Sequence, residues 1–267
     1  NESTRILFMS GARRFTFNDL VLFMNGPLLQ DKRKWLISAA DANNILAPML
    51  RRKPAYDFGT GPVVILDPGH GGEDTGAKGR HKTVEKRSSL DIAKSVLRQL
   101  RSTGMQVRLT RERDRAVELD ARSEYAKTHG GDIFVSIHLN SSPNHLAQGI
   151  ETYALPARGF SSTSGGTVID VKCPGNAFDP HNSLLAYFIH KEMLQSTQAT
   201  DRGIRRARWK VLRDAPCPAV LVECGFLSNA SEETKLGKKH YRDRIAGGIA
   251  NGILTYAGHM SEKSPDP

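Results

Sequence analysis

The sequence is poor in cysteine and contains no long apolar run. Its three cysteines are Cys173, Cys217 and Cys224, and no two of them have the Cys-x-x-Cys spacing of a metal site. Three cysteines do not make a disulfide framework, so we predict buried or surface thiols, with one disulfide and a leftover thiol as the alternative. No uninterrupted apolar stretch approaches the ~18 residues that a membrane-spanning helix needs. We therefore predict no integral membrane segment.

Signals for export and for nucleic-acid binding are also missing. Residues 1–5 carry no apolar signal core, which leaves two alternatives: synthesis without a signal segment, or removal of a leader. The formal net charge of +10 favours polyanionic partners. However, the sequence has no zinc-finger spacing and no aromatic RNA-binding signature, so we predict no nucleic-acid partner. Anionic cell-wall polymers and lipid headgroups remain as candidates.

The 267 residues are 39% hydrophobic and 25% charged, a composition that supports one large α/β domain with a small addition. We predict that residues 1–58 form an N-terminal α+β appendage, the end of a truncated β-rich module. In it, β-forming residues with an Asn25-Gly26 turn precede a helix that has Ser38 as its N-cap. Residues 62–257 are the main domain, and residues 258–267 are predicted to be a flexible tail.

The main domain alternates between short apolar runs and helical patterns, which indicates an α/β fold. Val63-Val-Ile-Leu is a fully apolar run that suits a strand buried on both faces. We predict strands at 63–66, 106–110, 133–138, 149–154, 209–212 and 219–223. We predict helices from about 83 to 104 and at 118–128, 183–194 and 241–256.

Four polar side chains lie at or near the ends of these predicted strands. His70 follows the strand 63–66, His138 ends the strand 133–138, and Glu223 ends the strand 219–223. Glu85 lies in the first turn of the helix that begins near residue 83. Ligands of open α/β sheets bind in the crevice outside the carboxyl ends of the strands. We therefore expect the four side chains to gather there.

Two imidazoles and a carboxylate are a common catalytic zinc set, which leaves a position open for water. Zn²⁺ would lower the pKa of that water towards ~7 and polarise a substrate carbonyl. Glu223 is our candidate for the carboxylate that takes the proton of the water and passes it to a leaving nitrogen. Each residue taken alone also has a structural explanation. His70 could be an ordinary loop residue, and Glu85 could be a carboxylate that stabilises the N-terminus of its helix. The role of His138 alone is ambiguous. A carboxylate between Val222 and Cys224 is hardest to explain without a function.

Two further patterns have simpler explanations. The glycine-rich stretch 68–76 lies between a strand and a helix, as a phosphate loop does, but it lacks Gly-Lys-Ser/Thr, and Glu73 and Asp74 would repel phosphate. An arginine cluster precedes the predicted strand 209–212 and fits a solvated face, with an anionic substrate groove as the alternative. His190 is expected to pack or cap on its helix. The arginines are Arg202, Arg205, Arg206 and Arg208.

The order of several short motifs resembles that of the zinc-dependent N-acetylmuramoyl-L-alanine amidases, in the group often called amidase type 3. Each motif is modestly specific, and the ordered set is highly specific. The matching segments are Ile65-Leu-Asp-Pro-Gly-His-Gly-Gly-Glu-Asp-Thr-Gly-Ala, Val84-Glu-Lys, Leu109-Thr-Arg, Phe134-Val-Ser-Ile-His-Leu-Asn, Asp201-Arg-Gly-Ile, Val211-Leu-Arg and Leu221-Val-Glu-Cys-Gly-Phe-Leu-Ser-Asn.

This resemblance implies Zn²⁺ bound by His70, Glu85 and His138, and a catalytic carboxylate at Glu223. It also implies a twisted, mostly parallel sheet with helices on both faces. The implied reaction is hydrolysis of the amide between N-acetylmuramic acid and L-alanine in peptidoglycan. The ligand set alone would equally suit a zinc peptidase that cuts within the stem peptide. A catalytically silent wall-binding module is a third hypothesis, against which the four intact residues argue.

Residues 156–181 bear on regulation. Many relatives that act in cell division carry a helix in this part of the chain, which covers the zinc until an activator displaces it. This stretch is rich in Gly, Ser and Pro and contains no amphipathic helix, so we predict a substrate loop and no obligatory activator protein. The alternative is that Asp170, Asp179 or His181 reaches the metal. We expect a monomer that acts on a peptidoglycan glycopeptide in the periplasm or outside the cell.

Overall fold

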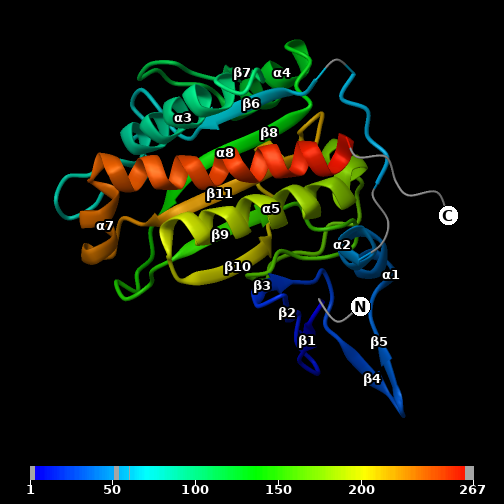
Figure 1. Cartoon of the computed structure of the whole chain (residues 1–267). Coiled ribbons are helices and arrows are strands. Elements are labelled where there is room, and N and C mark those ends of the chain that lie inside the picture. Colours follow the sequence, from blue (N-terminus) through cyan, green and yellow to red (C-terminus); the bar gives the residue numbers. More distant parts are fainter. Residues whose placement is uncertain (1–3, 51–53, 60, 262–267) are drawn as a thin grey trace.

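The computed structural model describes residues 4–50, 54–59 and 61–261. Nine strands form its central sheet: β1 (Ile6–Phe8), β2 (Arg14–Phe17), β3 (Leu20–Phe23), β6 (Val63–Pro68), β7 (Gln106–Leu109), β8 (Ile133–Asn140), β9 (Ile150–Ala154), β10 (Asp201–Arg206) and β11 (Ala219–Phe226). Their order across the sheet is β1-β2-β3-β10-β9-β11-β8-β6-β7 (Figure 1).

Most neighbouring strands of the sheet are parallel, as predicted. β6 is parallel to both β7 and β8, and β8 is parallel to β11, whereas β9 runs antiparallel to β11. β7 follows β6 in the chain and lies on one side of it in the sheet. β8 comes next in the chain and lies on the other side of β6. The carboxyl ends of β6 and β8 therefore flank a topological switch point, where α/β sheets bind ligands.

Helices cover both faces of the sheet, which confirms the predicted α/β class. α3 (Glu85–Arg101), α5 (Asp179–Thr197) and α8 (Lys239–Ser261) cover the face seen in Figure 1 and share one large apolar core with the strands. α4 (Leu119–Thr128) and α6 (Lys210–Arg213) pack on the other face, in a smaller core that includes Phe134 and Leu221. The short α7 (Ala230–Leu236) precedes α8. No described helix has the length and apolar character needed to cross a bilayer.

The N-terminal segment continues the same sheet. β3 pairs in parallel with β10, with Leu22 opposite Ile204, and Leu22 is buried in the large core. The rest of the segment contains a two-stranded sheet, β4 (Leu29–Asp31) and β5 (Lys34–Leu36), and the short helices α1 (Ala39–Asp41) and α2 (Ala47–Leu50), joined by a π-helical turn (Ala42–Leu46). The domain boundary near residue 60 stays a prediction, but the two segments share a sheet and a core.

Ser38 caps α1 as predicted, accepting a hydrogen bond from the backbone of Asp41. Asn25 and Gly26 form a bend between β3 and β4, where the sequence predicts a turn, although β3 and β4 belong to different sheets. The hairpin between β2 and β3 reverses at Asn18 and Asp19, both of which have positive φ, as a two-residue hairpin turn requires. The backbone NH groups of Asn25 and Gly26 donate to the buried carboxylate of Asp41.

The sequence pattern misplaced some elements near the C-terminus. The strand predicted at 209–212 is wrong: the strand is β10, at 201–206, and residues 210–213 form the helix α6. The helix predicted from 183 begins at Asp179, preceded by a 3₁₀ turn at Pro174–Phe178. Residues 258–261, predicted to be part of a flexible tail, belong to α8; residues 262–267 lie outside the described residues.

Candidate metal centre

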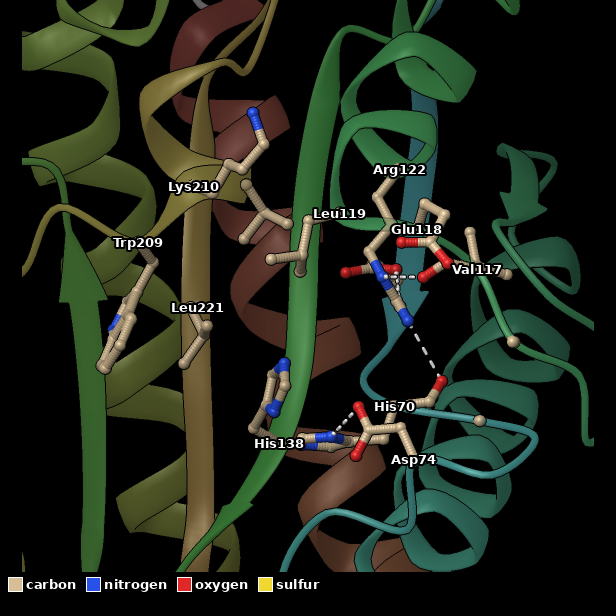
Figure 2. Close-up of a pocket in the computed structure, with 14 residues that line it drawn as sticks. His70, Asp74, Val117, Glu118, Leu119, Arg122, His138, Trp209, Lys210 and Leu221 are labelled. Atoms are coloured by element: carbon tan, nitrogen blue, oxygen red, sulfur yellow. Dashed lines mark hydrogen bonds and ion pairs between the residues drawn. The ribbon is translucent and has the colours of Figure 1, made fainter.

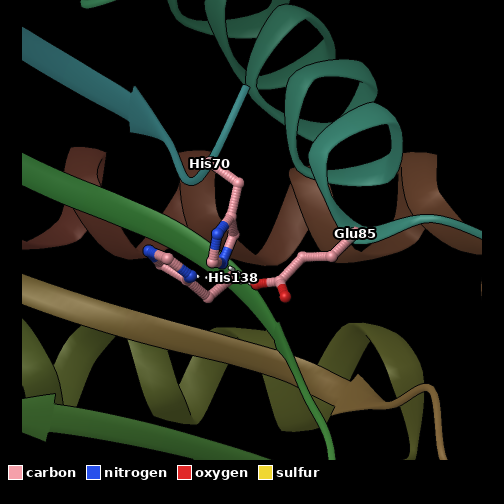
Figure 3. Close-up of side chains that lie close together, drawn as sticks. All are labelled: His70, Glu85 and His138. Carbon is pink, nitrogen blue, oxygen red and sulfur yellow. Dashed lines mark hydrogen bonds and ion pairs between the residues drawn. The ribbon is translucent and has the colours of Figure 1, made fainter. Parts of the chain in front are cut away.

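His70, Glu85 and His138 meet at the carboxyl ends of β6 and β8 (Figure 3). One ligand atom of each side chain lies within 4.8 Å of those of the other two. Glu85 Oε1 is 3.1 Å from His70 Nε2 and 2.9 Å from His138 Nδ1. The three residues come from a loop, the first turn of α3 and a strand, and in the described part of the chain no other such group of His, Cys, Asp and Glu forms.

The glycine-rich loop after β6 makes room for this cluster. A Cβ on Gly69 would lie 2.3 Å from the ring of His138, and a Cβ on Gly76 would lie 2.5 Å from Glu85 Oε2. His70 itself has φ 62°, a conformation that costs a non-glycine residue about 1 kcal/mol or more and persists only where the surroundings enforce it. The loop therefore packs closely around these three side chains.

Asp74 fixes the orientation of His70. Its carboxylate lies 2.8 Å from His70 Nδ1, so that nitrogen donates to Asp74 and Nε2 is left to face Glu85. Histidines that ligate metals usually donate their other ring NH to a carboxylate or carbonyl in this way. Asp74 was not predicted as a site residue, although its place four residues after His70 in the same loop was a usable signal.

Glu85 is held as an anion by its surroundings. Burial would raise the pKa of Glu85, but hydrogen bonds from the two histidines outweigh it, and the pKa lies well below its usual range. The backbone NH groups of Ala77 and Leu139 donate to its two oxygens. Burial lowers the pKa of His70, but the hydrogen bonds to Glu85 and Asp74 raise it by more, so the net shift of the pKa is upward. The pocket thus concentrates negative charge where a cation would sit.

Two buried arginines hold the backbone of the loop in place. Arg111 donates to the carbonyls of Pro68 and Gly69, and Arg122 donates to those of Pro68 and His70. Arg122 is also paired at 2.7 Å with Asp67, which is fully buried. Arg111 belongs to a motif that carried the family resemblance, but no pattern in the sequence linked either arginine to the loop.

Glu223 lies beside the cluster on β11. It is directly opposite His138 in the strand register. Its Oε2 is buried and has no hydrogen-bond partner among the described residues. Burial raises the pKa of Glu223 well above its usual range, and the nearby carboxylates of Glu85 and Glu151 raise it further. A buried carboxylate without a partner is costly, so this position indicates a functional role.

Two pockets adjoin the cluster and share His70, His138, Trp209 and Leu221. One has a volume of about 290 Å³ and extends towards the start of α4. Figure 2 shows Trp209 on one side of it and Val117 and Glu118 on the other. The second, of about 480 Å³, reaches Glu223 and contains Asn140 and Ser141. The three clustered side chains therefore line an open groove.

Residues 156–178 lie away from the metal centre. They follow β9, which is antiparallel to β11, so they leave the opposite end of the sheet from His138 and Glu223. Ser161 and Ser162 accept hydrogen bonds from Arg13 of the N-terminal segment. Asp170 pairs with Arg158. Asp179 and His181 belong to α5 and are not in the cluster, so none of the three acids or histidines considered for this stretch reaches it.

The other residues singled out in the sequence have structural roles or lie outside the cluster. His190 is buried between Thr152 and Asp201. All three cysteines are buried free thiols, as predicted. Arg206 is buried, and burial lowers its pKa to about 10. Arg208 donates to the carbonyls of Ala157 and Phe160. Neither arginine forms a solvated face. Arg202 and Arg205 are partly exposed and pair with Glu151.

Comparison with known proteins identifies the family. The sequence profile of the N-acetylmuramoyl-L-alanine amidases matches residues 64–255, and the chain belongs to this family. The amidase AmiA of Salmonella typhimurium is 38% identical over 222 residues, 74% of this chain and 77% of AmiA.

Two solved structures extend the comparison. The catalytic domain of the amidase CwlV from Bacillus (Paenibacillus) polymyxa is 36% identical with a TM-score of 0.62, and the match covers 73% of this chain and 97% of CwlV. The CwlD amidase of Clostridioides difficile, solved in complex with the GerS lipoprotein, is 29% identical with a TM-score of 0.63, covering 74% of this chain and 99% of CwlD.

Proposed function

We propose that this chain hydrolyses the amide between N-acetylmuramic acid and L-alanine in peptidoglycan, with Zn²⁺ held by His70, Glu85 and His138. Family membership supports the reaction, and the donor set supports the metal. Two imidazole nitrogens and one carboxylate oxygen suit Zn²⁺ and leave a coordination position open. The ion would supply an acidified water and a Lewis acid for the substrate carbonyl.

Glu223 acts as general base and then as general acid in this proposal. It takes a proton from the attacking water and delivers it to the amide nitrogen, which leaves as the amino group of L-alanine. Its place opposite His138 supports this role, as does its unpartnered Oε2, which has no competing hydrogen bond to break. Burial, together with the nearby carboxylates of Glu85 and Glu151, raises the pKa of Glu223 and so favours the protonated form that the second half of the reaction needs.

The groove suits a substrate with a sugar on one side and a peptide on the other. The smaller pocket offers the indole of Trp209, which is 48% exposed, and apolar side chains that suit the faces of a sugar ring. The second pocket contains Asn140 and Ser141, which suit peptide groups, and it contains Glu223. We therefore place the glycan in the smaller pocket and the stem peptide on the side of Glu223.

We propose that the catalytic domain acts as a monomer on the cell wall, in the periplasm or outside the cell, without an obligatory activator. CwlD was solved with a lipoprotein bound, so one relative does form a complex with a partner. In this chain, the stretch that could have covered the metal leaves the far end of the sheet and is hydrogen-bonded to the N-terminal segment. This placement supports access to the site without displacement of a plug.

The single observation that carries the proposal is the meeting of His70, Glu85 and His138 at the switch point. The test is the zinc content of purified protein, measured by mass spectrometry of the metal, for wild type, His70→Ala and His138→Ala. We expect one zinc per wild-type chain and loss of most of it in each variant. The exposed His240→Ala is the matched control and should keep its zinc. Full zinc in both cluster variants would contradict the assignment.

A further inference from the structure

A pair of arginines lies on the far side of Glu223 from the clustered histidines, beside the second pocket but not among its lining residues. Glu151 on β9 is directly opposite Glu223 in the strand register. Arg202 and Arg205 on β10, the next strand, pair with Glu151 Oε1 at 2.9 and 3.4 Å. This part of the sheet face adjoins the second pocket, because Asn140 lines that pocket and donates to Glu151. Trp209, which also lines the pocket, packs edge-on against Tyr153 beside Glu151.

The hydrogen bonds of Glu151 are already complete. Its side chain is only 3% exposed, and its Oε2 accepts from Asn140 Nδ2 at 3.0 Å and from the Tyr153 hydroxyl at 2.7 Å. With the bond from Arg202 Nε, the carboxylate accepts three hydrogen bonds and is held in a fixed position. The single negative charge of Glu151 therefore neutralises only one of the two positive guanidinium groups beside it.

The two guanidinium groups are held with their outer edges free. Arg202 Nε donates to Glu151, whereas Arg205 Nε donates to the carbonyl of Arg202 and lies 3.4 Å from Glu151 Oε1. In the described chain neither arginine has a hydrogen bond from an Nη nitrogen. Arg202 lies over the ring of Phe226 and Arg205 over that of Phe23, at 4.8 and 5.0 Å from the ring centres. Their side chains are 31% and 24% exposed. The aromatic rings and Glu151 fix both planes, so the Nη edges are preorganised donors.

Glu232 is a further carboxylate near Arg202. It accepts hydrogen bonds from the backbone NH groups of Gly149 and Phe226 and forms no ion pair with either arginine in the described residues. It does not fill the position that the Nη groups face. The arginine pair therefore has unused capacity for an anion.

We infer that Arg202 and Arg205 form a subsite for a carboxylate of the stem peptide. The inference rests on the proposed function, in which the peptide leaves on the side of Glu223. Neighbouring strands lie about 4.8 Å apart, so β10 lies about 10 Å from β11. An extended peptide advances about 3.5 Å per residue, and the arginine side chains cover part of the gap. A carboxylate on the second residue after the scissile nitrogen falls within their reach.

The test compares two N-acetylmuramoyl dipeptides that differ only in whether the second residue carries a free carboxylate or the neutral carboxamide. Wild type should cleave the carboxylate form with a kcat/KM about tenfold higher, chiefly through KM, because one charge-assisted hydrogen-bonded contact is worth about that factor. Arg205→Gln should lose this preference and cleave both at the rate of the carboxamide. Arg205→Lys should keep part of it. Arg158→Gln, an exposed arginine beyond the other end of the sheet, should keep all of it.

Equal rates on the two substrates in wild type, or a preference that survives in both Arg202→Gln and Arg205→Gln, would contradict the subsite. Cleavage of neither substrate by wild type would contradict the proposed function instead. Calorimetric titration with the two free dipeptides then decides about the subsite without turnover. We expect the carboxylate form to bind wild type about tenfold more tightly than the carboxamide. Equal affinities would rule the subsite out.

Discussion

At the scale of single residues, a substitution of Glu223 tests catalysis separately from binding of the metal. Glu223→Gln keeps the size of the side chain but cannot take up a proton. We expect the variant to keep its zinc and its fold and to lose about 10²–10⁴-fold in turnover, the usual contribution of general acid–base catalysis. Turnover and zinc content are measured on the same preparation.

Glu124→Gln is the matched control, because Glu124 is exposed on α4 and should tolerate the change. Near-wild-type turnover in Glu223→Gln would make Glu223 structural. Loss of zinc would make it a ligand.

Asp74 should act through His70. Asp74→Asn weakens the acceptor for His70 Nδ1 and leaves the three proposed ligands in place. Because such partners orient the ring, we expect zinc affinity to fall about 10–100-fold, measured by competition with a chelator. Replacement of Glu73 by Gln, one residue earlier in the same loop, should leave affinity unchanged. An unaltered affinity in Asp74→Asn would show that the packing of the loop alone positions His70.

The four site residues could be predicted because each lies at an end of an apolar strand or in a first helical turn. Such positions are visible in a linear pattern. The partners of these residues were not visible, since Arg122 lies 52 residues from His70 and contacts its backbone carbonyl. Glu151 and Arg205 were missed as a pair for the same reason: parallel pairing of β9 with β10 brings Arg205 beside Glu151.

At the scale of elements, the stretch 156–178 is the one that tests whether the enzyme is autoinhibited. Its exposed tip, residues 164–168, can be replaced by two glycines without touching Cys173, which belongs to the smaller core. Because the tip leaves the end of the sheet away from His138, we expect activity on purified peptidoglycan within about twofold of wild type, as for surface changes in general. A large rise in activity would show that the stretch inhibits the enzyme.

The apolar strands were predictable because both of their faces are buried. Val64, Ile65 and Leu66 are all inaccessible to solvent, and a fully apolar run in the sequence is typical of a strand buried on both faces. β10 was missed because its sequence, Asp-Arg-Gly-Ile-Arg-Arg, is mostly charged. Its charges are satisfied by tertiary partners such as Glu151 and His190, which no local pattern contains. Trp209-Lys-Val-Leu looked like a strand but forms a short helix that places Val211 and Leu212 in the smaller core.

At the scale of the whole molecule, the N-terminal segment is joined to the main domain through the shared sheet and core. Asn25 is buried and joins two parts of the chain, since its Nδ2 donates to Asp41 and its Oδ1 accepts from the backbone of Ala157. Asn25→Ala leaves a buried NH without its partner, so we expect a loss of about 1–3 kcal/mol in the free energy of unfolding. Urea unfolding measures this, with the exposed Asn251→Ala as control. Unchanged stability would indicate that the segment is only loosely attached.

The most direct test of the account is the position of the bond that is cut. Purified peptidoglycan is digested in water enriched in ¹⁸O, and the products are analysed by mass spectrometry. We predict released stem peptides that begin with the free amino group of L-alanine, and ¹⁸O in the lactyl carboxyl group of muramic acid. Shortened stems with ¹⁸O at a peptide carboxyl group would indicate a peptidase and contradict the account, and binding without any product would contradict it as well.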